Sequence, residues 1–351
     1  MIKKKKTRVI HVGDVPIGGD NPIVVQSMTK TDTRDVLSTV KQIRLLEDEG
    51  CEIIRVAVPD MDAAKAIGEI KRDIKIPIIA DIHFDWRLAL EAVKQGIDGL
   101  RINPGNIGAR WKVVEVVSAC KGRGIPIRIG VNAGSLSGKL LEKYGHPTPE
   151  ALVESAEEHI DILEELGFKE IKVSLKASDV PTTIEAYRLF SKRSRYPLHI
   201  GISEAGPSFT GIIKSSAGLG ILLSEGIGDT IRVSLTANPA LEIRVAYGIL
   251  RSLGIRTFGA DLVSCPTCGR CDIDIKGIAS EVEQRLKDIK RPIKVAVMGC
   301  AVNGPGEARE ADFGIAGGKG MGIIFRKGRV VKRVEEDKLL DALLEEIRKG
   351  E

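Results

Sequence analysis

The first 250 residues alternate between short runs of β-branched residues and longer stretches with helical periodicity. In the helical stretches apolar residues recur at intervals of three and four, as at Ala156, Ile160 and Leu163. Several of these stretches end at a glycine, which tolerates the left-handed conformation of a helix C-cap. The β-branched runs begin at Pro22, Glu52, Pro77, Gly99, Pro126, Glu170, Pro197 and Thr230. Eight strands alternating with eight helices predict an α/β fold of the (β/α)8 TIM-barrel type, and a doubly wound open sheet is the alternative.

From about residue 261 the repeat breaks, and the pattern predicts a second, small α+β domain. A cysteine-rich loop is followed by a predicted helix over residues 273–289, the strand Lys-Val-Ala-Val-Met-Gly and a glycine-rich turn. A hairpin is expected around Lys327-Gly328. A final amphipathic helix has the apolar face Leu339, Leu340, Leu343, Leu344 and Ile347. We therefore expect a barrel domain over residues 1–255 that binds substrate and a second domain over residues 256–351.

Composition narrows the class of protein. The chain has 351 residues, of which 43% are hydrophobic and 29% are charged, which excludes a disordered chain. A net charge of +5 with only 4% aromatic residues argues against a nucleic-acid partner. No run approaches the length of a membrane span, and the basic start of the chain has no apolar segment behind it. We expect a cytoplasmic protein without a membrane or nucleic-acid partner.

Basic residues interrupt the predicted strands, although parallel strands covered by helices are normally apolar on both faces. Most of them share a strand face with a polar residue or a glycine two positions further on, because side chains alternate along a strand. The later member of each pair falls near the carboxyl end of its strand, where TIM-barrel enzymes carry their active sites. The interrupting residues are Arg55, Arg101, Arg128, Lys172, His199 and Arg232.

Burying several cations requires anions to meet them, and the candidate internal anions Asp81 and Glu204 are outnumbered. Arginine offers a planar fork that suits bidentate contacts with phosphate. The pattern therefore favours a multiply charged anion such as a diphosphate at the barrel mouth. The alternative is a set of structural ion pairs that close the barrel floor.

The cysteines indicate a metal centre. Cys51 and Cys120 stand alone near predicted helix ends and are interpreted as packing residues. Cys265, Cys268 and Cys271 form a C-x2-C-x2-C run, and Cys300 follows 29 residues later. This spacing favours an iron–sulfur cluster over zinc, because four-cysteine zinc sites usually contain two C-x2-C pairs. On spacing alone, Cys271 would be a cluster ligand.

Four motifs together resemble the (E)-4-hydroxy-3-methylbut-2-enyl diphosphate synthase family of the methylerythritol phosphate route to isoprenoids. They are Cys-Pro-Thr-Cys-Gly-Arg from Cys265, Met-Gly-Cys-Ala-Val-Asn-Gly-Pro-Gly-Glu from Met298, Ala-Asp-Ile-His-Phe from Ala80 and Arg-Ile-Asn-Pro-Gly-Asn-Ile-Gly from Arg101. The resemblance covers nearly the whole chain. It implies a TIM barrel joined to an iron–sulfur domain similar to the cluster domains of sulfite and nitrite reductases.

The resemblance also implies roles for individual residues. The family's [4Fe–4S] cluster is held by three cysteines and a glutamate, which match Cys265, Cys268, Cys300 and Glu307. This assignment replaces Cys271, where the family usually carries threonine. Glu204 matches the proposed acid/base. Substrate contacts with 2-C-methyl-D-erythritol 2,4-cyclodiphosphate match Arg55, Asp81, Arg101, Asn103, Arg128, Asn132, Lys176, Arg232 and Ser234. Flavodoxin or ferredoxin is the implied electron donor, and the implied assembly is a homodimer.

Two other functions compete with this reading. A barrel enzyme whose cysteines bind a structural zinc ion could act on a pterin or a sugar phosphate without redox chemistry. A basic iron–sulfur or zinc protein could bind RNA, which would show as a steep dependence of binding on salt.

Overall fold

The computed structural model describes residues 2–268, 271, 273–300, 306, 308–318 and 320–350. The chain divides into two compact units, one that ends at Arg256 and one that begins at Thr257. Each unit has its own sheet and its own hydrophobic core.

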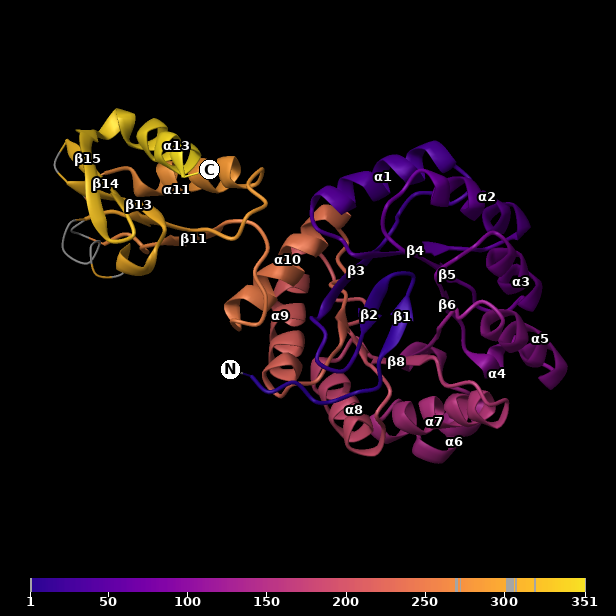
Figure 1. The fold of residues 1–351 in the computed structure, drawn as a ribbon. Coiled ribbons are helices and arrows are strands. Elements are labelled where there is room, and N and C mark those ends of the chain that lie inside the picture. Colours follow the sequence, from indigo (N-terminus) through magenta and orange to yellow (C-terminus); the bar gives the residue numbers. More distant parts are fainter. Residues whose placement is uncertain are drawn as a thin grey trace. The chain divides into compact units, whose positions relative to one another are not determined.

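The first unit is built around a cylinder of eight parallel strands (Figure 1). Neighbouring strands pair in the order β8-β7-β6-β5-β4-β3-β10-β9, and a parallel bridge from Val173 to Leu198 joins β8 to β9. The strands are β3 (Val24–Met28), β4 (Ile53–Ala57), β5 (Ile78–Asp81), β6 (Gly99–Arg101), β7 (Ile127–Asn132), β8 (Ile171–Lys176), β9 (His199–Ile200) and β10 (Thr230–Ile231). Each lies in one of the eight predicted runs, and the predicted (β/α)8 barrel is confirmed.

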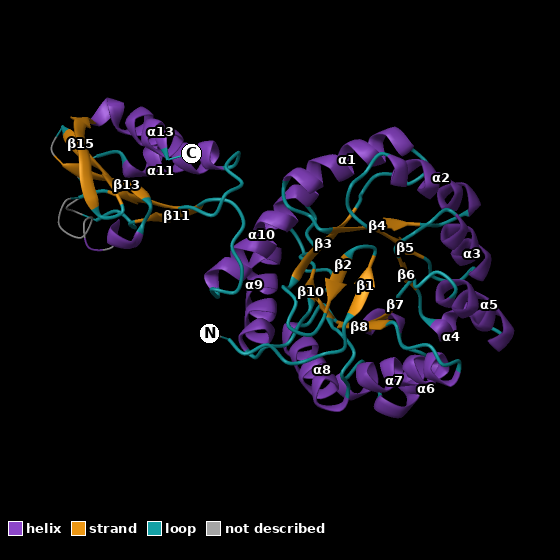
Figure 2. Cartoon of the chain, viewed as in Figure 1, coloured by secondary structure: helices purple, strands orange, loops and turns teal. Residues whose placement is uncertain are grey.

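Helices surround this cylinder (Figure 2). Aspartates cap several of them, since a side-chain oxygen of Asp35, Asp60 or Asp179 accepts a hydrogen bond from a free N–H of the first turn. The main helices are α1 (Val36–Asp48), α2 (Met61–Arg72), α3 (Trp86–Lys94), α5 (Arg110–Lys121), α7 (Pro149–Glu165), α8 (Val180–Arg193), α9 (Ser208–Ser224) and α10 (Pro239–Ser252). Short turns of helix, α4 (Pro104–Ile107), η1 (Ala133–Ser135) and α6 (Gly138–Tyr144), follow β6 and β7. Across the described residues, every helix is too short or too polar to cross a bilayer.

An amino-terminal hairpin that the sequence pattern did not predict lies against the barrel strands. It consists of β1 (Ile10–Val12) and β2 (Val15–Ile17), joined by a turn in which Gly13 has a φ of 59°. Ile10, Val12 and Ile17 pack against apolar residues near the starts of three barrel strands, namely Val24, Ile53 and Ile79. Apolar side chains therefore fill the amino-terminal end of the barrel, and its polar interior faces the carboxyl ends of the strands.

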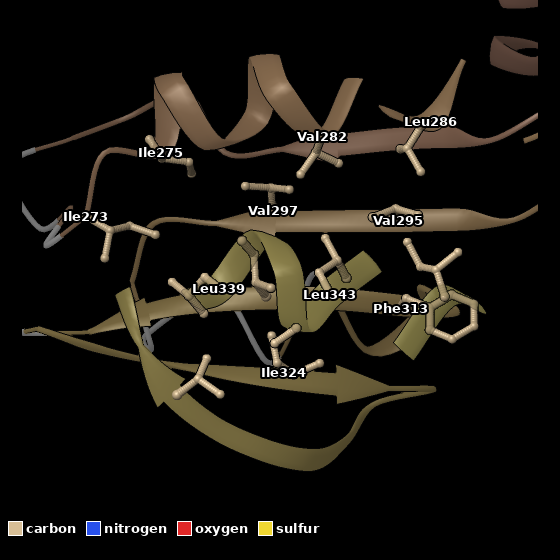
Figure 3. Close-up of a cluster of buried hydrophobic side chains, with 14 of the residues drawn as sticks. Ile273, Ile275, Val282, Leu286, Val295, Val297, Phe313, Ile324, Leu339 and Leu343 are labelled. Carbon is tan, nitrogen blue, oxygen red and sulfur yellow. The ribbon is translucent and has the colours of Figure 1, made fainter. Parts of the chain in front are cut away.

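The second unit is a five-stranded sheet covered by helices. The order is β11 (Asp261–Ser264), β12 (Lys294–Met298), β13 (Phe313–Gly318), β14 (Met321–Arg326) and β15 (Arg329–Glu335), with the first three strands parallel and the last two antiparallel. Helices α11 (Ile275–Leu286) and α13 (Leu339–Lys349) share one core with the sheet (Figure 3). Short 3₁₀ turns span Ala308–Glu310 and Glu336–Lys338. The expected α+β arrangement of this unit is confirmed.

Details of the second unit differ from the sequence expectation. The helix predicted over residues 273–289 is observed as the shorter helix α11 (Ile275–Leu286), which begins directly after its N-cap residue Asp274. Strand β11 was not predicted, because the residues from about 261 were assigned to the cysteine-rich loop. The hairpin at Lys327-Gly328 is confirmed, and both residues have the positive φ that a tight two-residue turn requires. Lys319 of the predicted glycine-rich turn lies outside the described residues.

We predict that Ile17→Ala lowers the free energy of unfolding by about 2–5 kcal/mol, because Ile17 is fully buried between the hairpin and the barrel strands. Urea unfolding followed by circular dichroism measures this loss. The control is Val9→Ala, since Val9 is 47% exposed and its truncation should cost little. Equal losses in the two variants would contradict a structural role for the hairpin.

Candidate active site and cysteine site

A cavity of about 580 Å³ lies at the carboxyl ends of the barrel strands. Strands β4 to β8 contribute charged or polar side chains to it, and the loops after β7, β8, β9 and β10 complete its wall. The lining residues are Arg55, Asp81, His83, Arg101, Arg128, Asn132, Ala133, Gly134, Ser135, Lys176, Ala177, Ser178, Ser203, Glu204, Arg232 and Ser234. The cavity is the size of a small-molecule site.

Positive charge dominates the cavity. Five of its lining residues are arginine or lysine and only two are carboxylates. Arg101, Arg128 and Lys176 are each less than a tenth exposed, because strand alternation directs them into the barrel. Burial lowers the pKa of Lys176 well below its usual value, and the charges of Arg128 and Arg232 lower it further. The cavity thus concentrates basic groups whose charged forms repel one another in the free protein.

Asp81, at the end of β5, is the buried carboxylate that holds two of these cations. Its Oδ2 lies 3.4 Å from Nε of Arg55, and its Oδ1 lies 3.1 Å from Nη1 of Arg101. Burial by itself would raise the pKa of Asp81, but Arg55, Arg101 and Arg128 together outweigh burial and hold that pKa at about 2. Asp81 therefore stays ionised at all physiological pH values and orients the two guanidinium groups.

Two glycines make room for the buried cations. A Cβ on Gly130 of β7 would lie 2.7 Å from Nε of Arg101. A Cβ on Gly201, just after β9, would lie 2.6 Å both from Nζ of Lys176 and from the carbonyl oxygen of Arg232. Contacts this short are too close for any side chain. Glycine at these strand positions is therefore part of the site.

Glu204 stands in the loop after β9 with a φ of 49°, in the left-handed region that non-glycine residues rarely adopt. The loop is anchored by the N–H of Ser203, which donates to the carbonyl of Ala177 at 3.1 Å, and by the N–H of Thr236, which donates to Gly206 at 3.0 Å. Such a conformation costs of the order of 1 kcal/mol or more and is typical of functional sites. This backbone conformation places the exposed Glu204 side chain in the wall of the cavity.

Nine of the ten barrel residues predicted from the sequence line this one cavity. The tenth, Asn103, is buried next to it, where its side chain donates to the carbonyl of Gly130 and accepts from the N–H of Gly130. In this structure Asn103 therefore connects β6 to β7.

Sequence reasoning missed His83 as a lining residue. His83 lies two residues after Asp81, and a ring nitrogen lies 3.0 Å from Nη1 of Arg101. Burial, followed by the charge of Arg101, lowers the pKa of His83. The alternation of Asp81 and His83 in the Ala-Asp-Ile-His-Phe motif was the signal that could have found it. The loop residues Ala133, Gly134, Ser135, Ala177 and Ser178 were also missed, because a loop carries no period.

In the second unit, two adjacent parallel strands bring cysteines to the same edge of the sheet. Cys265 follows β11 directly, and Cys300 follows β12 after Gly299. The N–H of Cys265 donates to Val297, and the N–H of Gly299 donates to Sγ of Cys265 at 3.2 Å. In iron–sulfur proteins, hydrogen bonds from N–H groups to the cysteine sulfurs help to set the reduction potential of the cluster. A Cβ on Gly299 would collide with Sγ of Cys271 at 2.5 Å, so the backbone approaches the thiols closely here.

The predicted cluster ligands are only partly placed by the structure. Cys265, Cys268 and Cys300 are described, whereas Glu307 lies outside the described residues. Cys271, the alternative ligand from spacing, donates its thiol to the carbonyl of Ile273 and packs partly into the core. Among the residues described, no three potential ligands are already gathered as a metal site. Cys51 and Cys120 are buried, and burial raises the pKa of each thiol to about 12.

Comparison with known families accounts for both units. Residues 7–247 match the GcpE TIM-barrel domain, and residues 261–349 match the GcpE protein C-terminal domain. The chain belongs to the GcpE family. Relatives named 4-hydroxy-3-methylbut-2-en-1-yl diphosphate synthase (flavodoxin) include a protein of Thermodesulfovibrio yellowstonii, 66% identical over 99% of this chain and 100% of its own length. The Geobacter sulfurreducens protein of the same name is 63% identical over 99% of this chain and 98% of its own length.

Solved structures support the fold of the GcpE barrel. A dihydropteroate synthase from Coxiella burnetii covers 71% of this chain and 99% of its own, with 14% identity and a TM-score of 0.50. The Yersinia pestis enzyme in complex with a sulfonamide drug covers 71% of this chain and 100% of its own, with 9% identity and a TM-score of 0.51. At these identities the likeness shows the barrel fold alone.

We predict that Gly201→Ala in this GcpE protein weakens binding of inorganic diphosphate at least tenfold, because the added methyl group displaces Lys176 and meets the Arg232 carbonyl. Isothermal titration calorimetry measures the affinity. Gly220→Ala is the control, because a Cβ there meets nothing within 4 Å and alanine favours the helix α9. Undiminished binding in Gly201→Ala would show that Lys176 does not contribute to the anion site.

Proposed function

We propose that this protein converts 2-C-methyl-D-erythritol 2,4-cyclodiphosphate into (E)-4-hydroxy-3-methylbut-2-enyl diphosphate. The observation that carries the proposal is the cavity with five cations facing one buried and one exposed carboxylate. The name that these relatives carry specifies the product and a flavodoxin. When substrate and product are both written as fully protonated acids, the conversion takes up two electrons and two protons. It opens the ring at one carbon–oxygen bond and releases one water.

The arrangement of cations suits a cyclic diphosphate. Each phosphorus of such a ring carries one ionised oxygen at neutral pH, so the substrate brings two negative charges. Arg55 and Arg101 are oriented by Asp81, and Arg128 is held by the hydroxyl of Ser174 at 2.6 Å. These forks can contact the phosphate oxygens and stabilise the negative charge that develops on the leaving phosphate oxygen as the ring opens. Asn132, Arg232 and Ser234 complete the contacts in this proposal, with Asn103 acting through β7.

We propose that the electron-transfer group is a [4Fe–4S] cluster, and that its ligands are Cys265, Cys268, Cys300 and Glu307. The described part of this site fits such a cluster. Iron–sulfur clusters are bound by cysteine thiolates, and the absence of a side chain at Gly299 lets the backbone lie close to the cysteine sulfurs. When bound, the cluster supplies electrons one at a time and a Lewis acid for a substrate oxygen. A carboxylate is a harder ligand than a thiolate and is exchanged more easily. We therefore propose Glu307 as the ligand that a substrate oxygen would replace.

Glu204 is the proposed proton donor for the departing hydroxyl. Its loop fixes the backbone in a strained conformation at the cavity wall, so the carboxyl group needs little further ordering. Flavodoxin or ferredoxin is the proposed electron donor, since an acidic carrier is attracted by a chain of net charge +5. The functional assembly in this proposal is a homodimer.

The proposed function predicts that anaerobic protein with a reconstituted cluster turns over the cyclodiphosphate with a reduced artificial donor. In Arg128→Lys, kcat/KM should fall roughly 10- to 100-fold, because lysine keeps the charge but loses the bidentate fork. Product formation is followed by mass spectrometry, and the visible spectrum should be unchanged. Arg110→Lys is the control, since Arg110 is an exposed residue paired with Glu165. A wild type that forms no product refutes the function.

A second prediction concerns Glu204→Gln, which should bind substrate normally but lose about 10²–10⁴-fold in kcat. Glutamine keeps the shape and removes the transferable proton. Glu142→Gln is the matched control, because Glu142 is an exposed carboxylate on α6 away from the cavity. Near-normal kcat in Glu204→Gln would exclude Glu204 as the proton donor.

A third prediction separates the candidate cluster ligands. Cys271→Ser should assemble a normal [4Fe–4S] cluster, because the Cys271 thiol already hydrogen-bonds the Ile273 carbonyl and packs into the core. Cys300→Ser should fail to hold the cluster, and Glu307→Ala should hold one that loses iron. Iron content and electron paramagnetic resonance measure the outcome. Loss of the cluster in Cys271→Ser with retention in Glu307→Ala would reverse the assignment.

A further inference from the structure

A second polar layer lies inside the barrel beneath the cavity. Lys172 precedes Ser174 and Lys176 by two and four residues on β8, so it shares their inward face but stands nearer the start of the strand. Its Nζ has no hydrogen-bond partner among the described residues, and Lys172 is only 2% exposed. Nε2 of His199 and both polar atoms of the Gln26 side chain are unpartnered in the same way. None of these three residues lines the cavity.

In the part of the chain that the structure describes, Lys172 has no counter-ion of its own. The carboxylate whose charge favours its ammonium form belongs to Asp229, just before β10. Asp229 is already engaged, because one oxygen pairs with Lys4 at 2.9 Å and accepts from Thr7, while the other accepts from the N–H of Leu198 at 2.8 Å. A buried ammonium without a partner is costly, so the uncharged amine is favoured in the free protein.

The other groups around Lys172 are cationic or neutral. Arg128 of β7 and Arg55 of β4 repel its charged form. His199 of β9 donates to or accepts from the Thr230 hydroxyl at 2.7 Å, and burial lowers the pKa of His199 well below its usual value, so its ring is neutral.

The remaining titratable neighbours leave this balance unchanged. Lys176 shares the strand, and its own pKa is lowered by burial and by Arg128. The Tyr187 hydroxyl of α8 accepts from the N–H of Leu175 and donates to the carbonyl of His199, and burial raises the pKa of Tyr187 and keeps the phenol neutral.

We propose that Lys172 is a charge-compensating residue that takes up a proton when the dianionic cyclodiphosphate enters the cavity above it. The inference rests on the proposed function for the identity of the anion. Lys172 acts from beside Arg128, its register partner on β7, and touches neither the substrate nor the cluster. In the free protein a neutral Lys172 reduces the repulsion among the cavity cations. Once the anion is bound, its negative charge favours the ammonium form, which then adds to the attraction.

Linkage gives the sign of the pH dependence. Burial, followed by the charge of Arg128, lowers the pKa of Lys172 to about 7 in the free protein. An anion raises that pKa, so binding takes up a proton and weakens as pH rises from the lower pKa towards the higher one. At pH 8, which is above this pKa, most of the free protein has a neutral Lys172, and this residue can therefore take up as much as about one proton. The cyclic diphosphate itself does not titrate near neutral pH, since each phosphorus carries a single strongly acidic oxygen.

The experiment is calorimetric titration of the oxidised holoenzyme with 2-C-methyl-D-erythritol 2,4-cyclodiphosphate, without reductant, in two buffers of different ionisation enthalpy. At pH 8 the wild type should take up about half a proton to one proton more than Lys172→Met. The ratio of dissociation constants, Lys172→Met over wild type, should be about tenfold or more at pH 6.5 and should approach one at high pH. Lys169→Met is the control, since Lys169 is exposed at the end of the helix-to-strand connection before β8.

Lys172→Arg gives an independent measurement, because arginine is charged without taking up a proton. Its affinity relative to the wild type should increase as pH rises from 6.5 to 9. Equal proton uptake by wild type and Lys172→Met, or a ratio of dissociation constants that does not change with pH, would overturn the inference while leaving the proposed function in place. A wild type that binds no cyclodiphosphate would overturn the proposed function and this inference with it.

Discussion

The barrel of this protein is organised around the repulsion among cations that share its interior. Arg55, Arg101, Arg128 and Lys176 converge where Asp81 is the buried carboxylate that lines the cavity. Asp81 satisfies two of the guanidinium groups directly, and its low pKa shows how strongly they act on it. The excess of positive charge remains, and a multiply charged anion is the ligand that relieves it. The structural ion-pair alternative does not supply enough carboxylates.

The rest of the barrel accommodates this concentration of charge. Gly130 and Gly201 remove side chains where Arg101 and Lys176 need space. The amino-terminal hairpin fills the opposite end with apolar groups, so the charged interior is separated from water on that side. Water exclusion strengthens each electrostatic contact in the cavity. Lys172 marks the limit of this arrangement, since its amine is buried outside the cavity lining and the carboxylate of Asp229 is already engaged by other groups.

The same rule of parallel strands positions the chemistry in both units. In the barrel, the loops after β7, β8, β9 and β10 complete the cavity. In the second unit, β11 and β12 are parallel neighbours, and Cys265 and Cys300 follow their carboxyl ends. Because the carboxyl ends of parallel strands lie at one edge, residues distant in sequence are brought together without a dedicated scaffold. Each of the two units matches a domain of the GcpE family.

The amino-acid sequence by itself determined the eight barrel strands, the hairpin at Lys327-Gly328 and nine residues of the cavity. The strands and the hairpin follow from local periodicity and turn chemistry, which a short window of sequence contains. The full set of cavity residues came from the family resemblance. The cluster assignment depended on motifs, and Glu307 lies outside what the structure describes.

Only the tertiary structure decided which partners the buried polar groups have. Asn103 bonds to Gly130, His83 reaches Arg101, and Asp229 is taken by residues from the start of the chain, which leaves Lys172 without a counter-ion. These pairings join segments up to 222 residues apart. Periodicity shows which way a side chain points, whereas the group it meets depends on how distant segments pack.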